Sequence, residues 1–148
     1  LQNRGALFST DPEHPNFLEP AKRPYNTIIP GMITSNTNLV SSFGVMGGFQ
    51  QPQGHLQVVS NMVDFGMNPQ EALDSARFRI SIEEETIFVE DCFDKEVISG
   101  LKSKEHSVSV ISGVNRGFFG GGQIINRNGE GMLTGGSDPR KDGLSVSY

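Results

Sequence analysis

Short apolar runs, and stretches in which apolar and polar residues alternate, predict the strands of this chain of 148 residues. Strands are predicted over residues 28–34, 39–45, 78–82, 86–90 and 107–112. Two more, over 122–126 and 131–135, flank Asn128-Gly129, the dipeptide that most strongly indicates a tight hairpin turn. The polar turn 35–38 joins the first two strands into another hairpin.

Three other segments have the pattern of helices. They cover residues 52–65, 68–77 and 94–104. The first carries apolar residues at helical spacing and stops at Gly66. The second opens with a capping motif, in which Asn68 caps the helix, Pro69 takes the first helical position, and Glu71 lies three residues after the cap. The third is weakened by Gly100.

The N-terminal residues are less regular than the rest. Residues 1–8 could complete a strand, whereas residues 9–24 carry four prolines, a density that blocks both helices and central strands. The order of elements, with strands and helices not in regular alternation, indicates a single α+β domain over residues 1–148 with mainly antiparallel strands. Because the strands are short, the core is thin, and we expect the chain to pack against another one.

Charge and composition exclude several kinds of partner. The formal net charge is −5 and the basic residues form no stripe interleaved with aromatics, so nucleic-acid binding is not expected. No apolar run approaches the roughly 20 residues of a membrane helix, so we expect no membrane span in this chain. Cys92 is the single cysteine and cannot form an internal disulfide. The compartment stays open, with the cytoplasm slightly favoured over the periplasm or the extracellular space.

Gly47 and Gly48 carry the clearest functional signal, because they lie between a buried-looking strand and an amphipathic helix. Two glycines at this point leave backbone N–H groups bare. Such groups can hold a phosphate, a carboxylate or the oxyanion of an acyl transfer. No side chain nearby in the sequence supplies a nucleophile. We therefore interpret the junction as half of an active site, whose reactive group comes from elsewhere.

Other candidate motifs have plainer interpretations. No G-x-S-x-G motif occurs, and His14, His55 and His106 have neither a nucleophile partner nor a zinc-binding spacing, so each is expected to be an ordinary surface or half-buried residue. The acidic run 83–85 is typical of a solvated turn, and no metal or organic cofactor is expected. The glycine-rich stretch 117–122 is not a P-loop. It either allows close backbone approach or lines an active site.

Four segments together resemble the small subunit of the gamma-glutamyltranspeptidase family. They are KRP at 22–24, GG at 47–48, DFGMNPQEALD at 64–74 and SDPR at 137–140. Each segment alone is moderately specific, but their order and spacing extend the resemblance from Leu1 to Tyr148. Within the last segment, Asp138 and Arg140 are also predicted to form an ion pair that stabilises the turn.

The resemblance implies the N-terminal nucleophile hydrolase fold, four layers in the order αββα, of which this chain is the C-terminal part. In the family, a precursor zymogen cuts itself into a large and a small subunit. The new terminal threonine of the small subunit attacks the substrate, and its own α-amine is the base. That threonine would lie upstream of Leu1, so residues 1–148 would form the part of the small subunit without its nucleophile strand. Gly47 and Gly48 would form the oxyanion hole.

The resemblance also implies partners and an activity. The partners are the large subunit from the same precursor, a small-molecule amide substrate, and a second copy of the heterodimer. The activity is that of a hydrolase or acyltransferase of glutathione metabolism. Two alternatives remain: a catalytically inactive homologue acting as a structural or small-acid-binding module, and a phosphate-binding domain. Phosphate binding is the weaker alternative, because the sequence places no cationic side chain beside the glycines at the junction.

The chain departs from the family pattern where the α-amine of a glutamyl substrate binds. Arg4 and Leu7 stand where typical members have an acid or amide and an aspartate, and Arg4 would repel an ammonium group. Asn26 and Thr27 replace paired serines that help bind the glutamyl carboxylate, and both retain hydrogen-bonding capacity. We hypothesise an acyl donor that keeps a carboxylate, bound by Arg4, but lacks the amine, as in relatives that hydrolyse oxamate or glutaryl side chains of cephalosporins. An ion pair at the surface or between subunits is the alternative for Arg4.

Overall fold

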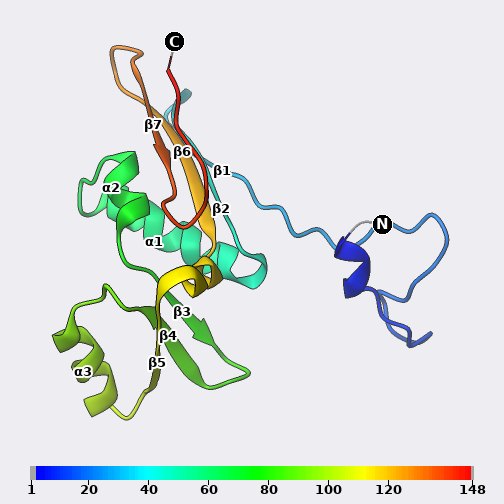
Figure 1. Cartoon of the computed structure of the whole chain (residues 1–148). Coiled ribbons are helices and arrows are strands. Elements are labelled where there is room, and N and C mark those ends of the chain that lie inside the picture. The colour runs from blue at the N-terminus through cyan, green and yellow to red at the C-terminus, as the bar shows by residue number, and fades with distance from the viewer. Residues whose placement is uncertain (1–2, 148) are drawn as a thin grey trace.

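The computed structural model describes residues 3–147, which form two β-sheets connected by helices (Figure 1). The larger sheet is antiparallel, in the order β1 (Gly31–Ser35), β2 (Asn38–Met46), β6 (Gly121–Arg127) and β7 (Leu133–Ser137). The smaller sheet has the order β3 (Phe78–Ser81), β4 (Thr86–Glu90) and β5 (Ser107–Ile111). Only the pair of β4 and β5 is parallel among the described strands, so the prediction of an α+β chain with mainly antiparallel strands is confirmed.

Helices connect and cover the two sheets. The α-helices are α1 (Gln51–Val63), α2 (Pro69–Asp74) and α3 (Lys95–Ser103), and short 3-10 helices form η1 (Asn3–Leu7), η2 (Gly48–Gln50) and η3 (Gly113–Phe119). Helices α1 and α2 pack against the larger sheet, whereas α3 packs beside β5. The capping motif at the start of α2 is present, with the Asn68 side chain accepting from the Gln70 and Glu71 amides at 2.9 and 3.0 Å.

The last hairpin closes through a longer loop than the sequence predicts. The final strand is predicted over 131–135, but β7 begins at Leu133. The Asn128 amide donates to the Met132 carbonyl at 3.0 Å, and Asn128 Oδ1 accepts from the Glu130 and Met132 amides at 3.0 and 2.9 Å. The asparagine therefore organises the loop with its side chain, and the strand starts two residues later.

The N-terminal segment is helical where a strand was one expectation. Residues 3–7 form η1, so the expectation that residues 1–8 complete a strand is wrong for this part, and residues 1–2 lie outside the described region. The Phe8 amide donates to the Gly5 carbonyl at 3.2 Å, which closes the turn. In Figure 1 this blue segment lies to one side of the two sheets, and an extended stretch leads from it to β1.

The core lies between the larger sheet and helices α1 and α2. Its buried apolar side chains are Phe43, Val45, Val58, Ala72, Leu73 and Ile124. Glycines let these layers approach closely. A Cβ atom on Gly54 of α1 would lie 2.8 Å from a Val45 methyl group, and one on Gly122 of β6 would lie 2.4 Å from a Leu73 methyl group. Helix α1 is thereby held against β2, directly after the glycine pair.

Glutamine side chains of α1 bind the edge of the smaller sheet. Gln57 accepts from the Phe78 amide at 2.9 Å and donates to the Phe78 carbonyl at 3.0 Å. Gln53 makes the same pair of bonds with Ile80, at 2.8 and 3.0 Å. The two glutamines are one helical turn apart, and their targets alternate along β3, so the helix face follows the strand edge. This pairing satisfies edge groups that would otherwise be open to another strand.

The face of the larger sheet away from α1 and α2 exposes large apolar side chains. Met32, Ile125 and Leu133 are 70%, 55% and 66% exposed. Met32 pairs with Ser42, and Ser42 with Ile125, so these positions share one face of the sheet. An extended apolar surface of this kind marks an interface, which supports the expectation that the chain packs against further polypeptide. No helix within the described residues has both the length and the apolar character needed to cross a membrane.

Candidate active site

One cleft brings together most of the residues singled out in the sequence. It has a volume of about 770 Å³ and lies between η1, the extended segment before β1, the end of β2 and the first turns of α1. Arg4, Thr27, Gly47 and Gly48 all line it. Asn26 lines a smaller pocket of about 240 Å³, which shares Thr27 and Gly48 with the cleft. Segments far apart in the sequence therefore meet at the glycine pair.

Gly47 and Gly48 form the turn between β2 and α1. Their φ angles of +142° and +59° lie in the region that favours glycine. Neither amide donates a hydrogen bond to another group within residues 3–147, while the Gly47 carbonyl accepts one from the Gln50 amide at 3.1 Å. Two N–H groups thus remain available at the cleft, beside the N-terminus of α1, where the helix dipole favours negative charge.

The glycine-rich stretch 117–122 lies against this turn. A Cβ atom on Gly120 would lie 2.0 Å from the Met46 carbonyl oxygen, and one on Gly47 would lie 3.2 Å from Gly120 Cα. Gly120 also has a φ angle of +84°, and the next residue, Gly121, lines the cleft. The expected close backbone approach is therefore confirmed, whereas a role of the stretch in lining an active site stays a prediction.

Sequence reasoning missed Gln51, which links two sides of the cleft. Its side-chain amide donates to the Gly48 carbonyl at 3.1 Å and also to the Thr27 carbonyl. The glutamine therefore ties the segment before β1 to the glycine turn. A single glutamine in the first turn of a helix has no sequence pattern that marks such a link, because the partner carbonyl is 24 residues away.

Asn26 and Thr27 have different surroundings. Asn26 donates from its side chain to the Ile28 carbonyl at 3.2 Å, so its amide group supports its own loop. Thr27 lines both the cleft and the smaller pocket. Arg4 reaches the cleft from η1. Arg4, Thr27 and the glycine pair therefore line one cleft, and residues of these types can bind an anionic ligand.

His55 lines the same cleft from α1 and is half-buried. Its Nε2 atom accepts a hydrogen bond from the Val45 amide at 3.0 Å. Burial lowers the pKa of His55 from its ordinary value of 6.5. The expectation of a half-buried histidine is met, but no sequence pattern indicates its bond to the strand that leads into the glycine turn.

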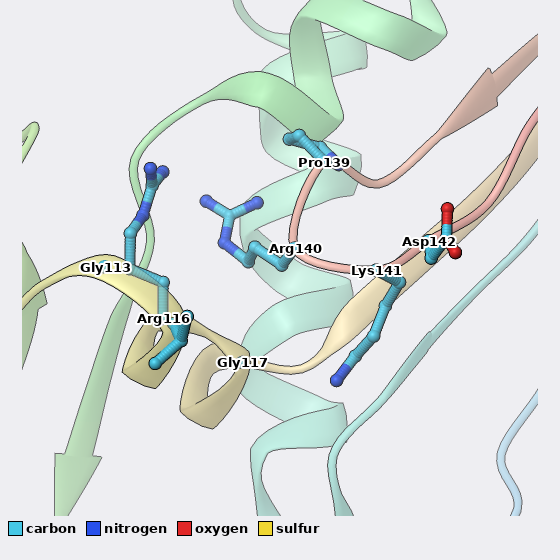
Figure 2. A pocket seen from close by; sticks show the side chains of 8 residues that line it. Gly113, Arg116, Gly117, Pro139, Arg140, Lys141 and Asp142 are labelled. Atoms are coloured by element: carbon cyan, nitrogen blue, oxygen red, sulfur yellow. The ribbon is translucent and has the colours of Figure 1, made fainter.

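A buried network of charges joins β7 to the smaller sheet. Asp138, which follows β7, pairs with Arg77 at 2.6 Å and with Arg140 at 3.2 Å, so the predicted ion pair with Arg140 is confirmed. Glu90, at the end of β4, accepts from Arg140 Nε at 2.6 Å and from Arg116 Nε at 2.9 Å. The side chains of Arg116 and Arg140 enter the space between η3 and the turn after β7 (Figure 2). Arg116 and Arg140 also border a second cavity of about 500 Å³.

The network sets the charge states of its members. Burial raises the pKa of Glu90, but hydrogen bonds from Arg140, Arg116 and the Arg77 amide outweigh that effect and leave the pKa below its ordinary value. Burial lowers the pKa of Arg140, yet its bonds to Glu90 and Asp138 raise that pKa overall. Glu90 and Arg140 therefore stay ionised, and their buried contacts give the cluster a structural role.

The network was only partly visible in the sequence, because Glu90 and Arg140 are 50 residues apart. Arg140 also donates to the Leu73 and Ser75 carbonyls at 2.8 and 2.9 Å, which satisfies the C-terminal end of α2. Within residues 3–147 there is no group of three or more histidine, cysteine, aspartate or glutamate side chains placed to hold a metal ion.

Comparisons with known proteins cover the whole chain. A family model described as gamma-glutamyltranspeptidase matches residues 1–148. The glutathione hydrolase-like YwrD proenzyme of Bacillus subtilis is 39% identical over 99% of this chain and 28% of its own length. The oxamate amidohydrolase proenzyme of Klebsiella pneumoniae is 31% identical, again over 99% of this chain and 28% of its own length. The chain thus spans little more than a quarter of these curated relatives.

A solved structure shows the same arrangement of elements. The cephalosporin acylase from Bacillus halodurans superposes with a TM-score of 0.87 and is 46% identical, over 100% of this chain and 27% of the acylase chain. Together with the match of the family model, this likeness confirms the predicted N-terminal nucleophile hydrolase fold.

Proposed function

The chain belongs to the gamma-glutamyltranspeptidase family, and from this premise we propose that it forms part of an amide hydrolase or acyltransferase. The observation that carries the proposal is the pair of amides of Gly47 and Gly48. They lie at a cleft of about 770 Å³ and donate to no other group among the described residues. Backbone amides so placed can receive the oxyanion of a tetrahedral intermediate.

The proposed reaction uses a nucleophile from outside residues 1–148. A terminal threonine hydroxyl attacks the carbonyl carbon of the amide, and the threonine α-amine takes the hydroxyl proton. The carbonyl oxygen becomes an oxyanion and accepts hydrogen bonds from Gly47 and Gly48. The C–N bond then breaks, the leaving amine takes the proton, and an acyl ester remains on the threonine. Water or an amine acceptor attacks this ester and releases the acyl group. Losing one oxyanion donor raises such a barrier by about 2.7–4 kcal/mol.

The proposed acyl donor carries a carboxylate and lacks an α-amine. Arg4 lines the cleft together with Thr27 and Gly48. A guanidinium binds a carboxylate through two parallel hydrogen bonds, whereas it repels an ammonium group. One similar protein is named for a substrate of this kind, since oxamate has a carboxylate beside its amide. Asn26 would contribute by holding the loop that presents Thr27.

Family membership, rather than the sequence argument, favours acyl transfer over phosphate binding. No cationic side chain lies beside the glycines in the sequence, although Arg4 lines the same cleft. The partners proposed for the chain are the large subunit from the same precursor and a second copy of the heterodimer. The exposed apolar side chains of Met32, Ile125 and Leu133 would be covered in such an assembly.

The test compares two anilides on the full-length protein, one γ-glutamyl and one glutaryl, which differ only in the α-amine. We expect kcat/KM to be at least about tenfold higher for the glutaryl compound, because an unfavourable charge contact costs about 1.4 kcal/mol or more. A strong preference for the γ-glutamyl compound would remove the substrate proposal and keep the amidase. Hydrolysis of neither compound, with a precursor that mass spectrometry shows to be uncut, would favour an inactive homologue.

A further inference from the structure

His55 lies beside the end of β2, where β2 is not paired with β1. The first residue of β1, Gly31, pairs with Phe43, and the chain before Gly31 does not pair with β2. Val45, two residues further along β2, pairs with Gly122 on its other side. Its amide would be left without a strand partner at the cleft. His55 Nε2 accepts from that amide at 3.0 Å and so takes the place of the missing strand.

Only one charge state of the imidazole can make this bond. To accept at Nε2, the ring must be neutral and carry its proton on Nδ1. A protonated ring would present an N–H group to the N–H group of Val45, and both donors would lose their partner. The ring is also held by an edge-on contact with Phe43, with centroids 5.2 Å apart and planes at 61°. The histidine therefore cannot turn to a new partner without breaking this packing.

The bond acts on the backbone that leads into the glycine turn. The Val45 side chain is buried in the core, with 1% exposure, and only Met46 separates Val45 from Gly47. A shift of the Val45 backbone would therefore be passed to the Gly47 and Gly48 amides. Catalytic groups displaced by about 1 Å can lose about a hundredfold in rate.

We propose that neutral His55 is a positioning residue, which holds the end of β2 so that the Gly47 and Gly48 amides face the cleft, and that protonation of His55 releases them. This inference rests on the proposed function of the cleft. It requires the active form to be the neutral imidazole, so activity is retained above the pKa of His55 and falls as the pH drops through it.

The surroundings of His55 leave few other charges to govern this titration. From η1, Arg4 is the other titratable side chain that lines the cleft among the described residues. From β2, Phe43 and the Val45 backbone face the ring, and from β6 the uncharged Gln123 lines the cleft. Helix α1 itself carries no other titratable side chain. Burial lowers the pKa of His55, so the transition is expected below 6.5.

The experiment uses the processed full-length protein and three variants. His55→Gln keeps an acceptor near Nε2 that does not titrate in this range, and His55→Leu removes it. His106→Gln is the matched control, because His106 is exposed and lies away from the cleft. Values of kcat and KM for the best anilide are measured between about pH 4.5 and pH 8.5.

We expect His55→Leu to lower kcat by about tenfold to a hundredfold at every pH, with KM changed much less, because the amides act on the transition state. His55→Gln is expected to stay within about fivefold of the parent near neutral pH and to lose less activity than the parent below pH 6.5. Wild-type kcat and an unchanged acid limb in both His55 variants would overturn the proposal.

Hydrogen exchange separates this proposal from the function on which it rests. Protection of peptides spanning residues 43–48 is measured by mass spectrometry and corrected for intrinsic exchange. If the parent hydrolyses neither anilide, loss of protection at acid pH in the parent but not in His55→Gln would still support the contact. Equal protection in both, at every pH, would overturn the proposal. If His55→Leu fails to fold, this comparison of the parent with His55→Gln still tests the proposal.

Discussion

The carboxylate of Asp138 accepts a hydrogen bond from the Gly122 amide at 2.7 Å, and so joins the buried charge network to the strand that borders the cleft. Gly122 pairs with Val45, and Gly121 lines the cleft itself. Asp138 therefore has two roles, since it neutralises Arg77 and also fixes the start of β6. The charge network and the glycine turn are therefore connected through the first residues of β6.

Replacing Asp138 should strongly destabilise the protein. In Asp138→Asn, Arg77 and Arg140 lose a carboxylate whose side chain is fully buried. Leaving a buried charge without its partner typically costs about 3–5 kcal/mol. We expect the free energy of unfolding, measured by urea denaturation of the full-length protein, to fall by about this amount. Asp142→Asn, an exposed neighbour, should change it by less than about 0.5 kcal/mol. Equal effects of the two changes would contradict the assigned role.

Glu90 should account for part of the loss of stability in acid. The folded state lowers the pKa of Glu90 below its ordinary value of 4.5. Its ionised form therefore contributes stability that is complete above pH 4.5 and is lost as the pH falls through the folded value. Glu90→Gln should be less stable than the parent at neutral pH but should lose less stability between about pH 5 and pH 3. Parallel stability curves for the two proteins would show that Glu90 does not contribute to the acid transition.

A single methyl group at Gly120 should disturb the glycine turn. In Gly120→Ala, the new Cβ atom would lie 2.0 Å from the Met46 carbonyl oxygen, and the φ angle of +84° disfavours alanine. We expect the free energy of unfolding to fall by about 2 kcal/mol or more, and kcat to fall with it. Gly129→Ala is the control, because a Cβ atom there meets nothing within 4 Å. An active and fully stable Gly120→Ala would mean that the two loops are not as close as described.

Arg4 should affect substrates only through their carboxylate. In Arg4→Gln, kcat/KM for glutaryl anilide should fall by about tenfold to a hundredfold, because a charge-assisted hydrogen bond contributes about 1.5–3 kcal/mol. The uncharged butyryl anilide is the matched substrate and should be hydrolysed at nearly the parent rate. If both substrates lose activity equally, Arg4 supports the structure of the cleft and does not bind the carboxylate.

Local features were predictable from the sequence because their causes lie within a few residues. The capping motif at Asn68 and the turn at Gly47 and Gly48 depend on side chains and backbone angles next to them. The interpretation of the glycine turn as half of an active site also came from local sequence, because no nucleophile lies near the turn, and it stays a prediction. The tight turn predicted at Asn128-Gly129 was wrong, because the same dipeptide also occurs in longer loops such as the one observed here.

The contacts that hold the site together depend on strand register and on the meeting of distant segments. His55 reaches Val45 only because β1 begins at Gly31, whose partner is Phe43, and so does not extend along β2 as far as Val45. Glu90 meets Arg140 only because β4 ends beside the turn after β7. No periodicity along the chain encodes these pairings, so they became visible only in the assembled fold.

The proposed reaction depends on the Gly47 and Gly48 amides, whose role is tested by a crystal structure of the processed protein with a glutaryl-like boronic acid bound to its nucleophile. The boronate oxygen stands in for the oxyanion of the tetrahedral intermediate. We predict that this oxygen lies about 2.7–3.1 Å from both amide nitrogens. A boronate oxygen directed away from the glycine turn, with the two amides bonded to protein or solvent, would contradict it.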